Sequence, residues 1–100
     1  MYTIYPAVFF KEENGYSVIF PDLNYLATGG DSLADAVSMA SDCLTGYLYY
    51  AEIDNEPVGA PSDINEINPE RIAKELDYSY EQALIKLIYA DIEGFAKLQL

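Results

Sequence analysis

The first thirty residues form short runs of β-branched and aromatic residues separated by turn residues, which predicts short β-strands joined by tight turns. Residues 3–11 predict the first strand. Pro6 within it indicates an edge position or an irregular opening, because proline donates no backbone hydrogen bond. Asn14 and Gly15 suit the two positive-φ positions of a type I′ turn, so we expect a hairpin there and a return strand over residues 16–20.

The return strand ends at Pro21 and Asp22, which suit a turn because proline sets φ and an aspartate side chain bonds nearby backbone. Residues 25–28 predict a third strand, closed by Gly29 and Gly30. We expect one of these glycines to adopt a left-handed conformation before the next element. The three strands together predict a β-meander.

After Gly30 the spacing of apolar residues changes to three and four, which predicts a long amphipathic helix over residues 32–52. Ser32 and Asp35 have the spacing of a capping box, with Asp in place of the usual Glu. Gly46 either permits close packing on the sheet or has no structural role. The apolar face of this helix, which we expect to pack on the sheet, comprises Leu33, Ala36, Val37, Ala40, Cys43, Leu44, Tyr47, Leu48 and Ala51.

The second half of the chain has weaker patterns. Ile64 and Ile67 indicate a short extended stretch, and Asn68 with Pro69 predicts a second helix start, with the helix over residues 69–76. Residues 83–90 fit a helix by their leucine and isoleucine spacing and fit a strand equally well by alternation. Periodicity alone favours a helix there.

The composition is that of one folded domain. Half of the 100 residues are apolar, no apolar run approaches the roughly 20 residues of a membrane span, and the start lacks the pattern of a signal peptide. Cys43 is the only cysteine, which excludes an intrachain disulfide and a cysteine metal cluster. We therefore expect a cytoplasmic protein without a membrane partner.

The net charge of −12 narrows the choice of partner. Residues 31–58 carry six acidic side chains and no basic one. Such a chain repels phosphate backbones, so we expect no direct binding to nucleic acid, whereas a basic protein would be attracted and its approach accelerated. The alternative is that the acidity serves only solubility.

The residues give little support to catalysis. The chain has no histidine, and the carboxylates of Glu12, Glu13, Asp22, Asp31 and Asp35 fall in predicted turns or at the start of the helix, where carboxylates are usually solvated or capping. The pattern indicates neither a phosphate-binding loop nor the regular spacing of a calcium loop. We expect no enzyme activity, no metal and no cofactor.

Tyrosines are frequent, ten in all, and exposed tyrosines are enriched at protein interfaces. Tyr47 fits the apolar face of the long helix, whereas Tyr49 and Tyr50 straddle its edge. We expect at least one of these two to be exposed; the alternative is that both pack on the sheet or on the C-terminal segment.

Residues 5–23 and 28–36 resemble the opening of the HicB-like antitoxins. The family pattern runs Tyr-Pro-apolar, an acidic turn, Gly-Tyr, Phe-Pro-Asp-Leu, then Thr-x-Gly-Asp-Ser/Thr-Leu and an alanine-rich helix. The chain departs from it at residues 24–26, Asn-Tyr-Leu, where Pro-Gly-Cys is usual. The matching positions are Tyr5, Pro6, Gly15, Tyr16, Phe20, Pro21, Asp22, Leu23, Thr28, Gly30, Asp31 and Ser32.

The resemblance implies an α+β, partial ribonuclease-H-like fold, with a three-stranded meander, a long helix packed across it and a fourth strand within residues 83–90. A short closing helix should follow Asp91. The whole chain would form a single domain, with a core at residues 1–56 and an extension at residues 57–100, in which no DNA-binding module is evident. Residues 63–82 are longer than the family needs, and we assign them no role.

The resemblance also implies an antitoxin that neutralises a small basic HicA-like, RNA-cleaving toxin by covering it. As contact residues we nominate Glu12, Glu13, Asp22, Leu23, Tyr25 and Asp31. Open sheet edges favour a homodimer or tetramer. Two alternatives stay open: an orphan HicB-like oligomeric binding domain without a toxin, and a metal-dependent nuclease.

Overall fold

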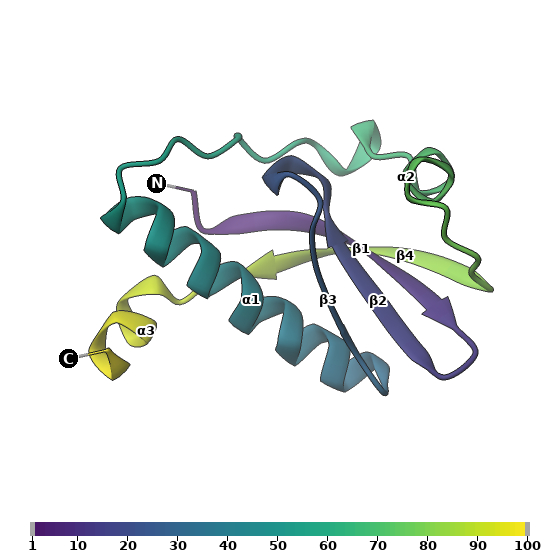
Figure 1. Cartoon of the computed structure of the whole chain (residues 1–100), viewed down its shortest axis with the longest axis horizontal. Helices are drawn as coiled ribbons and strands as arrows, with labels where there is room; N and C mark the ends of the chain where they lie inside the picture. Colours follow the sequence, from purple (N-terminus) through teal and green to yellow (C-terminus); the bar gives the residue numbers. More distant parts are fainter. Residues whose placement is uncertain (1, 100) are drawn as a thin grey trace.

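A single antiparallel sheet lies at the centre of the computed structural model, which describes residues 2–99 (Figure 1). The strand order is β3-β2-β1-β4. A long helix, α1, packs on one face of the sheet and a short helix, α2, on the other. The elements are β1 (Ile4–Glu12), β2 (Gly15–Phe20), η1 (Pro21–Leu23), β3 (Leu26–Gly30), α1 (Leu33–Ile53), η2 (Ile64–Glu66), α2 (Pro69–Leu76), β4 (Gln82–Tyr89) and α3 (Ile92–Leu98).

The predicted meander is confirmed, but the turn of its first hairpin is not of the predicted type. Glu12 pairs with Gly15, so the two loop residues are Glu13 and Asn14, and neither has a positive φ. Gly15, at φ +149°, is the residue that needs glycine. The Asn-Gly pair therefore marks the hairpin correctly, displaced by one residue from the loop we expected.

Pro6 lies in an inner strand and not at an edge, since β1 is flanked by β2 and β4. Ala90 N–H donates to Thr3 C=O, so Thr3 and Ala90 form a hydrogen-bonded pair. Hydrogen-bonded pairs alternate along antiparallel strands, and Pro6–Leu87, three pairs further on, is therefore not one of them. The Pro6 nitrogen therefore faces away from β4, and the pairing of β1 with β2 begins only at Val8. Proline is tolerated because no partner is lost at that position.

Gly29 and Gly30 also differ from expectation, because both are extended residues inside β3 and neither has a positive φ. A Cβ on Gly29 would lie 2.7 Å from the Tyr16 carbonyl oxygen, and one on Gly30 would lie 2.5 Å from the Ala36 nitrogen. Close approach of backbone, and not a left-handed turn, requires glycine at these two positions.

The long helix begins where the sequence predicts. Ser32 is its N-cap, and its hydroxyl oxygen accepts from the backbone N–H of Asp35 at 3.1 Å. Small residues on the buried face, Ala36 and Ala40, let the helix lie close to the strands, and Leu44 and Leu48 fill the main core. Gly46 faces the Phe95 ring of α3 at an ordinary distance and is not required for contact with the sheet.

Helix α2 gives residues 63–82 a role that the sequence did not reveal. Its boundaries and its Asn68 cap are as predicted. Ile72 and Ala73 pack on Val8, Phe10 and Ile19, and so cover the sheet face opposite α1. This second core explains why β1 reads as apolar on both faces.

The segment before α2 is a 3-10 turn over Ile64–Glu66 and not the extended stretch we expected. Asp63 accepts from Asn65 N–H, and Glu66 accepts from Asp63 N–H. This capping box overrides the extended preference of the two flanking isoleucines.

The structure decides the ambiguous last quarter in favour of a strand followed by a helix. β4 pairs antiparallel with β1 along its whole length. Asp91 caps the closing helix α3 by accepting from Gly94 N–H at 2.9 Å. The Phe95 ring of α3 contacts the rings of Tyr49 and Tyr50 on α1. Tyr50 is half exposed, and Tyr49 is partly buried.

Candidate partner-binding surface

Carboxylates from three separate segments meet at one end of the molecule. Glu12 and Glu13 lie at the β1–β2 hairpin, Asp31 and Asp35 at the start of α1, and Glu81 just before β4. We call these five residues the acidic end. Glu13, Asp31, Asp35 and Glu81 are exposed, and Glu12 is partly buried.

Two glycines bring the segments of the acidic end together. A Cβ on Gly15 would lie 2.6 Å from the Gly30 carbonyl oxygen, so the hairpin passes directly over the end of β3. Gly30 in turn touches the backbone of α1 at Ala36. The hairpin carboxylates and those of the helix start therefore share one surface, although they lie about twenty residues apart in the sequence.

Three shallow, open hollows are lined by members of the acidic end, two at the hairpin tip and one at the start of α1. Glu12, Glu13 and Asp31 line the first, Glu12, Glu13 and Glu81 the second, and Asp31 and Asp35 the third. No lysine or arginine lines any of the three. The hollows are thus lined by negative charge, and the exposed Lys11, next to Glu12 in the chain, lines none of them. The Glu12 carboxylate also accepts from the Ser17 hydroxyl at 2.8 Å.

Asp22 and Leu23, also nominated as contact residues, are engaged inside the molecule. Asp22 accepts from the backbone N–H of Ser62 at 2.8 Å and from its hydroxyl at 2.6 Å. This pair ties the long connection after α1 to the turn after β2. Leu23 is 1% exposed and belongs to the main core. Neither residue offers a free side chain to a partner in this conformation.

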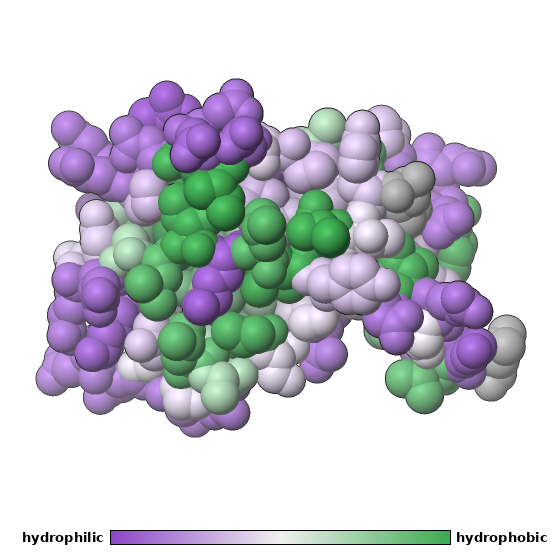
Figure 2. All heavy atoms as spheres, turned by 180° about the vertical axis from the view of Figure 1, so that it is seen from behind, coloured by the Kyte–Doolittle hydropathy of each residue, from purple (hydrophilic) through white to green (hydrophobic). Residues whose placement is uncertain are grey.

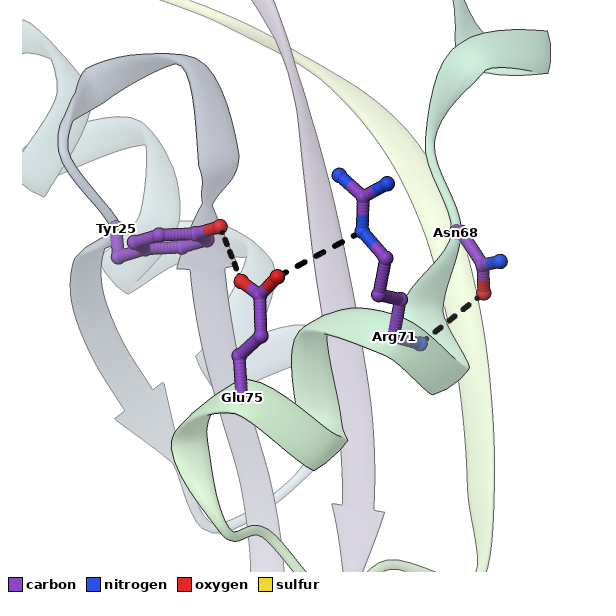
Figure 3. A network of polar contacts seen from close by, with 4 residues as sticks. All are labelled: Tyr25, Asn68, Arg71 and Glu75. Carbon is purple, nitrogen blue, oxygen red and sulfur yellow. Dashed lines mark hydrogen bonds and ion pairs between the residues drawn. The ribbon is translucent and has the colours of Figure 1, made fainter.

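Tyr25 is exposed but bonded to α2 (Figure 3). Its hydroxyl donates to a Glu75 carboxylate oxygen at 2.7 Å, and the other oxygen of Glu75 lies 3.7 Å from Arg71 Nε. The hydrogen bond to Glu75 raises the pKa of Tyr25, with smaller contributions from desolvation and the Glu75 charge. Asn24 and Tyr25 both have positive φ, at the place where the chain departs from the family pattern.

Tyr5, another matching position, has a folding role. Tyr5 is buried in the core, and its hydroxyl donates to the Gly59 carbonyl at 2.7 Å. Burial raises the pKa of Tyr5, and the nearby Asp22 charge adds to the effect. Cys43 is half-buried on α1, and burial raises the pKa of its thiol. These observations make the motif mainly a signature of the fold and leave Glu13, Tyr25 and Asp31 as the exposed members of the nominated set.

Sequence reasoning missed an apolar surface. Ile4, Leu87 and Tyr89 are 47%, 58% and 61% exposed, and they share one sheet face because Ile4 pairs with Tyr89 and Leu87 lies two residues before it. We call these three residues the β4 strip. Figure 2, which turns the back of Figure 1 to the viewer, shows apolar side chains gathered in the middle of that face. The alternation in residues 83–89 indicated such a face, but not that α2 stops short of it.

Two further findings concern residues 2–99. No group of three or more His, Cys, Asp or Glu side chains is placed to hold a metal ion there. None of the helices in this part of the chain combines the length and the apolar character needed to cross a membrane.

The comparisons with known proteins agree with one another. The family model described as the HicB-like antitoxin of bacterial toxin–antitoxin systems matches residues 5–97. Two curated relatives from Photorhabdus laumondii, antitoxin HicB 2 and antitoxin HicB 1, are each 41% identical, over 59 and 56 residues. These matches cover 58% and 55% of this chain, which spans 42% and 36% of the relatives' lengths.

Solved structures share the fold. A toxin–antitoxin complex from Streptococcus pneumoniae is similar with a TM-score of 0.80 and 24% identity, over 95% of this chain and 73% of that one. The N-terminal domain of Burkholderia pseudomallei antitoxin HicB has a TM-score of 0.65 and 22% identity, over 88% of this chain and 98% of that one. At these identities the likeness concerns the architecture alone.

Proposed function

The chain belongs to the HicB-like antitoxin family, and on that premise we propose that it neutralises a small basic, RNA-cleaving toxin of the HicA type by binding it. The observation that carries the surface assignment is the acidic end, where exposed carboxylates from three segments meet without a basic neighbour in the hollows that they line. The chain would act by occlusion and would have no catalytic role. Its place would be the cytoplasm, where such a toxin meets RNA.

Charge explains how such a surface would work. A toxin that grips RNA needs basic side chains to neutralise phosphates. The same side chains would be attracted to the acidic end, and long-range attraction would raise the association rate. Occupying them with carboxylates would exclude the RNA backbone. The contact set that we propose is therefore Glu12, Glu13 and Asp31 from the nominated residues, with Asp35 and Glu81 added by the structure.

We also propose that residues 1–100 act as one unit. The segment after residue 56 contributes β4 beside β1 and α2 over the second face of the sheet. Removing it would expose Val8, Phe10 and Ile19, so residues 1–56 would not bind a toxin as an independent domain.

The proposal is tested by co-expressing the chain with the protein encoded by the adjacent gene. We expect the two to co-purify, and we expect the adjacent protein to cleave RNA alone and to lose this activity when the chain is added. Absence of a complex at micromolar concentrations, or RNA cleavage unchanged by an excess of the chain, would refute it.

Charge reversal tests the surface. Glu13→Lys combined with Asp31→Lys should weaken toxin binding by about tenfold or more, mainly through the association rate. The matched control is Glu52→Lys combined with Glu56→Lys, which reverses two exposed acids at and beyond the far end of α1, Glu52 lying about 25 Å from Asp35 along the helix. An equal loss in the control would mean that net charge matters and the acidic end does not.

A second candidate is an orphan HicB-like domain that binds only copies of itself, as a homodimer or tetramer. The β4 strip is the observation that favours self-association. It is compatible with the antitoxin role, since the strip and the acidic end are different surfaces. A chain that self-associates but ignores the adjacent protein would support the orphan function.

A further inference from the structure

Strand β4 presents an open edge of the sheet. Its inner side pairs with β1, and in the part of the chain that the structure describes no strand pairs with its outer side. Ala90 N–H donates to Thr3 C=O, so the even-numbered residues of β4 direct their backbone groups to β1. The backbone groups of Ala83, Ile85 and Leu87 therefore point outward.

The open edge of β4 ends at Tyr89, where a side chain of α1 occupies the backbone carbonyl. The Ser41 hydroxyl of α1 donates to the Tyr89 carbonyl oxygen at 2.9 Å, which occupies that acceptor. From Ala83 to Leu87 the N–H and C=O groups remain available. An edge of this length is a template for pairing with another strand unless it is covered, bulged or charged.

Side chains and backbone are exposed together along this edge. Leu87 carries outward backbone groups, and its side chain lies in the β4 strip beside Ile4 and Tyr89. On the same sheet face Ile85 is half-buried against the α2 cluster, which continues the strip inward. A strand added here would gain main-chain hydrogen bonds and would bury apolar side chains in one step.

Charge decides between possible occupants of the edge. Lys86 is the single charged residue in residues 82–90, and residues 2–10 carry none. A basic toxin would find no complementary charge here. A second copy of this chain, at −12, can approach another copy with least repulsion through the surface that lacks acids.

We infer that β4 pairs antiparallel with β4 of a second copy, so that two four-stranded sheets join into one and the side chain of Leu87 gains a neighbouring strand. A twofold axis makes the surface self-complementary, as an isologous dimer requires. The inference gives the proposed self-association a surface, and it does not depend on toxin binding.

The position of the twofold axis follows from the same charge. Pairing centred on Lys86 would set two lysines directly opposite each other, which is unfavourable. Pairing centred on Ile85 sets Lys86 opposite Leu84 of the other copy and joins the outward groups of Ala83 to those of Leu87. An axis at Leu87 would pair Ile85 with Tyr89, whose carbonyl oxygen already accepts from Ser41, so we place the axis at Ile85.

The oligomeric state of the purified chain, measured by sedimentation equilibrium, tests the interface. The unmodified chain should be dimeric, and Leu87→Lys should raise the dimer dissociation constant by about tenfold or more, because an apolar side chain is lost from the interface. Ile53→Lys is the matched control, since Ile53 is 55% exposed on α1, away from the edge. A monomeric unmodified chain, or equal dissociation of both variants, would overturn the inference.

Cross-linking tests the axis independently of variant stability. In a Cys43→Ser background, Ile85→Cys should form a disulfide-linked dimer under mild oxidation, because hydrogen-bonded antiparallel pairs place Cα atoms about 5.5 Å apart. Leu87→Cys should cross-link much more slowly, and faster cross-linking there would overturn the axis at Ile85. Leu87→Lys should still bind the adjacent gene's product, whereas the Glu13→Lys, Asp31→Lys variant should still dimerise. The two proposals can thus fail separately.

Discussion

Gly15 and Gly30 meet where the β1–β2 hairpin passes the start of α1, and the acidic end exists because neither has a side chain. At this scale the family motif is a set of packing and bonding requirements. The Asp22 carboxylate accepts from Ser62, the Tyr5 hydroxyl donates to the Gly59 carbonyl, and Ser32 caps α1. A substitution at these positions should act first on stability and only afterwards on partner binding.

The same substitution at two glycines should have opposite effects. Gly30→Ala should destabilise the fold by about 1–3 kcal/mol, because its Cβ would meet the Ala36 backbone at 2.5–2.8 Å. Gly46→Ala should stabilise it by about 0.5–1 kcal/mol, since Gly46 lies inside α1 and its Cβ would have room beside Phe95. Urea unfolding of both variants measures the two changes in the free energy of unfolding. If both changes had the same sign, the packing that we describe around one of the glycines would be wrong.

Because Tyr5 is buried, we expect the free energy of unfolding to fall at high pH. Burial raises its pKa in the folded state above the unfolded value of about 10, so the folded state holds the proton more tightly. Its contribution is complete below pH about 10 and is lost as the pH rises through the folded-state pKa. Tyr5→Phe should lower the free energy of unfolding at pH 8 by about 0.5–1.5 kcal/mol through the lost bond to Gly59.

The corresponding measurement is urea unfolding of both proteins between pH 8 and pH 11. Tyr5→Phe should show a smaller decline with pH than the unmodified chain. Parallel curves would mean that Tyr5 ionises as easily in the folded state as in the unfolded one.

Among the elements, α2 and β4 complete the fold, because β4 pairs with β1 and α2 covers the second face of the sheet. The sequence predicts α2 correctly in its limits, yet its place over the second sheet face depends on contacts with β1 and β2. The network of Tyr25, Glu75 and Arg71 joins α2 to the turn before β3. Because these side chains are exposed, we expect their contribution to stability to be small beside that of the buried residues of α2.

Two positions on α2 test this ranking. Ile72→Ala should cost about 2–5 kcal/mol, because Ile72 is 5% exposed and packs in the second core. Leu76→Ala, on the same helix at 36% exposure, should cost much less. Comparable losses for both variants in urea unfolding would show that α2 does not dock through Ile72.

At the scale of the whole molecule, charge and apolar surface are separated. The acidic end gathers carboxylates around the hairpin tip, whereas the β4 strip lies among residues with almost no charge. A net charge of −12 attracts a basic partner and repels a second copy. The two proposed assemblies should therefore respond to salt in opposite directions.

Raising the salt from about 50 mM to about 500 mM shortens the Debye length severalfold. Toxin association should slow, because the steering field is screened, and self-association should strengthen, because the repulsion between copies is screened as well. Stopped-flow binding and sedimentation equilibrium at both salt concentrations measure the two effects. If added salt weakened both associations or strengthened both, one of the two surfaces would be assigned wrongly.

The sequence alone determined what depends on neighbours along the chain. The caps at Ser32 and Asn68, the limits of α1 and α2, and the hairpin signal at Asn14 and Gly15 are local features, set by residues within a few positions of one another. Periodicity alone favoured a helix over residues 83–90, and the fourth strand was correctly predicted only through the family resemblance.

The tertiary structure decided what depends on residues far apart. Asp22 is bonded to Ser62, forty residues away, and Leu23 lies in the core, so these two nominated contact residues are engaged inside the molecule. Glu81 joined the acidic end only because β4 returns to the side of β1. Periodicity reports which face of an element is apolar, but packing alone decides how much of that face is covered, and α2 leaves the β4 strip bare.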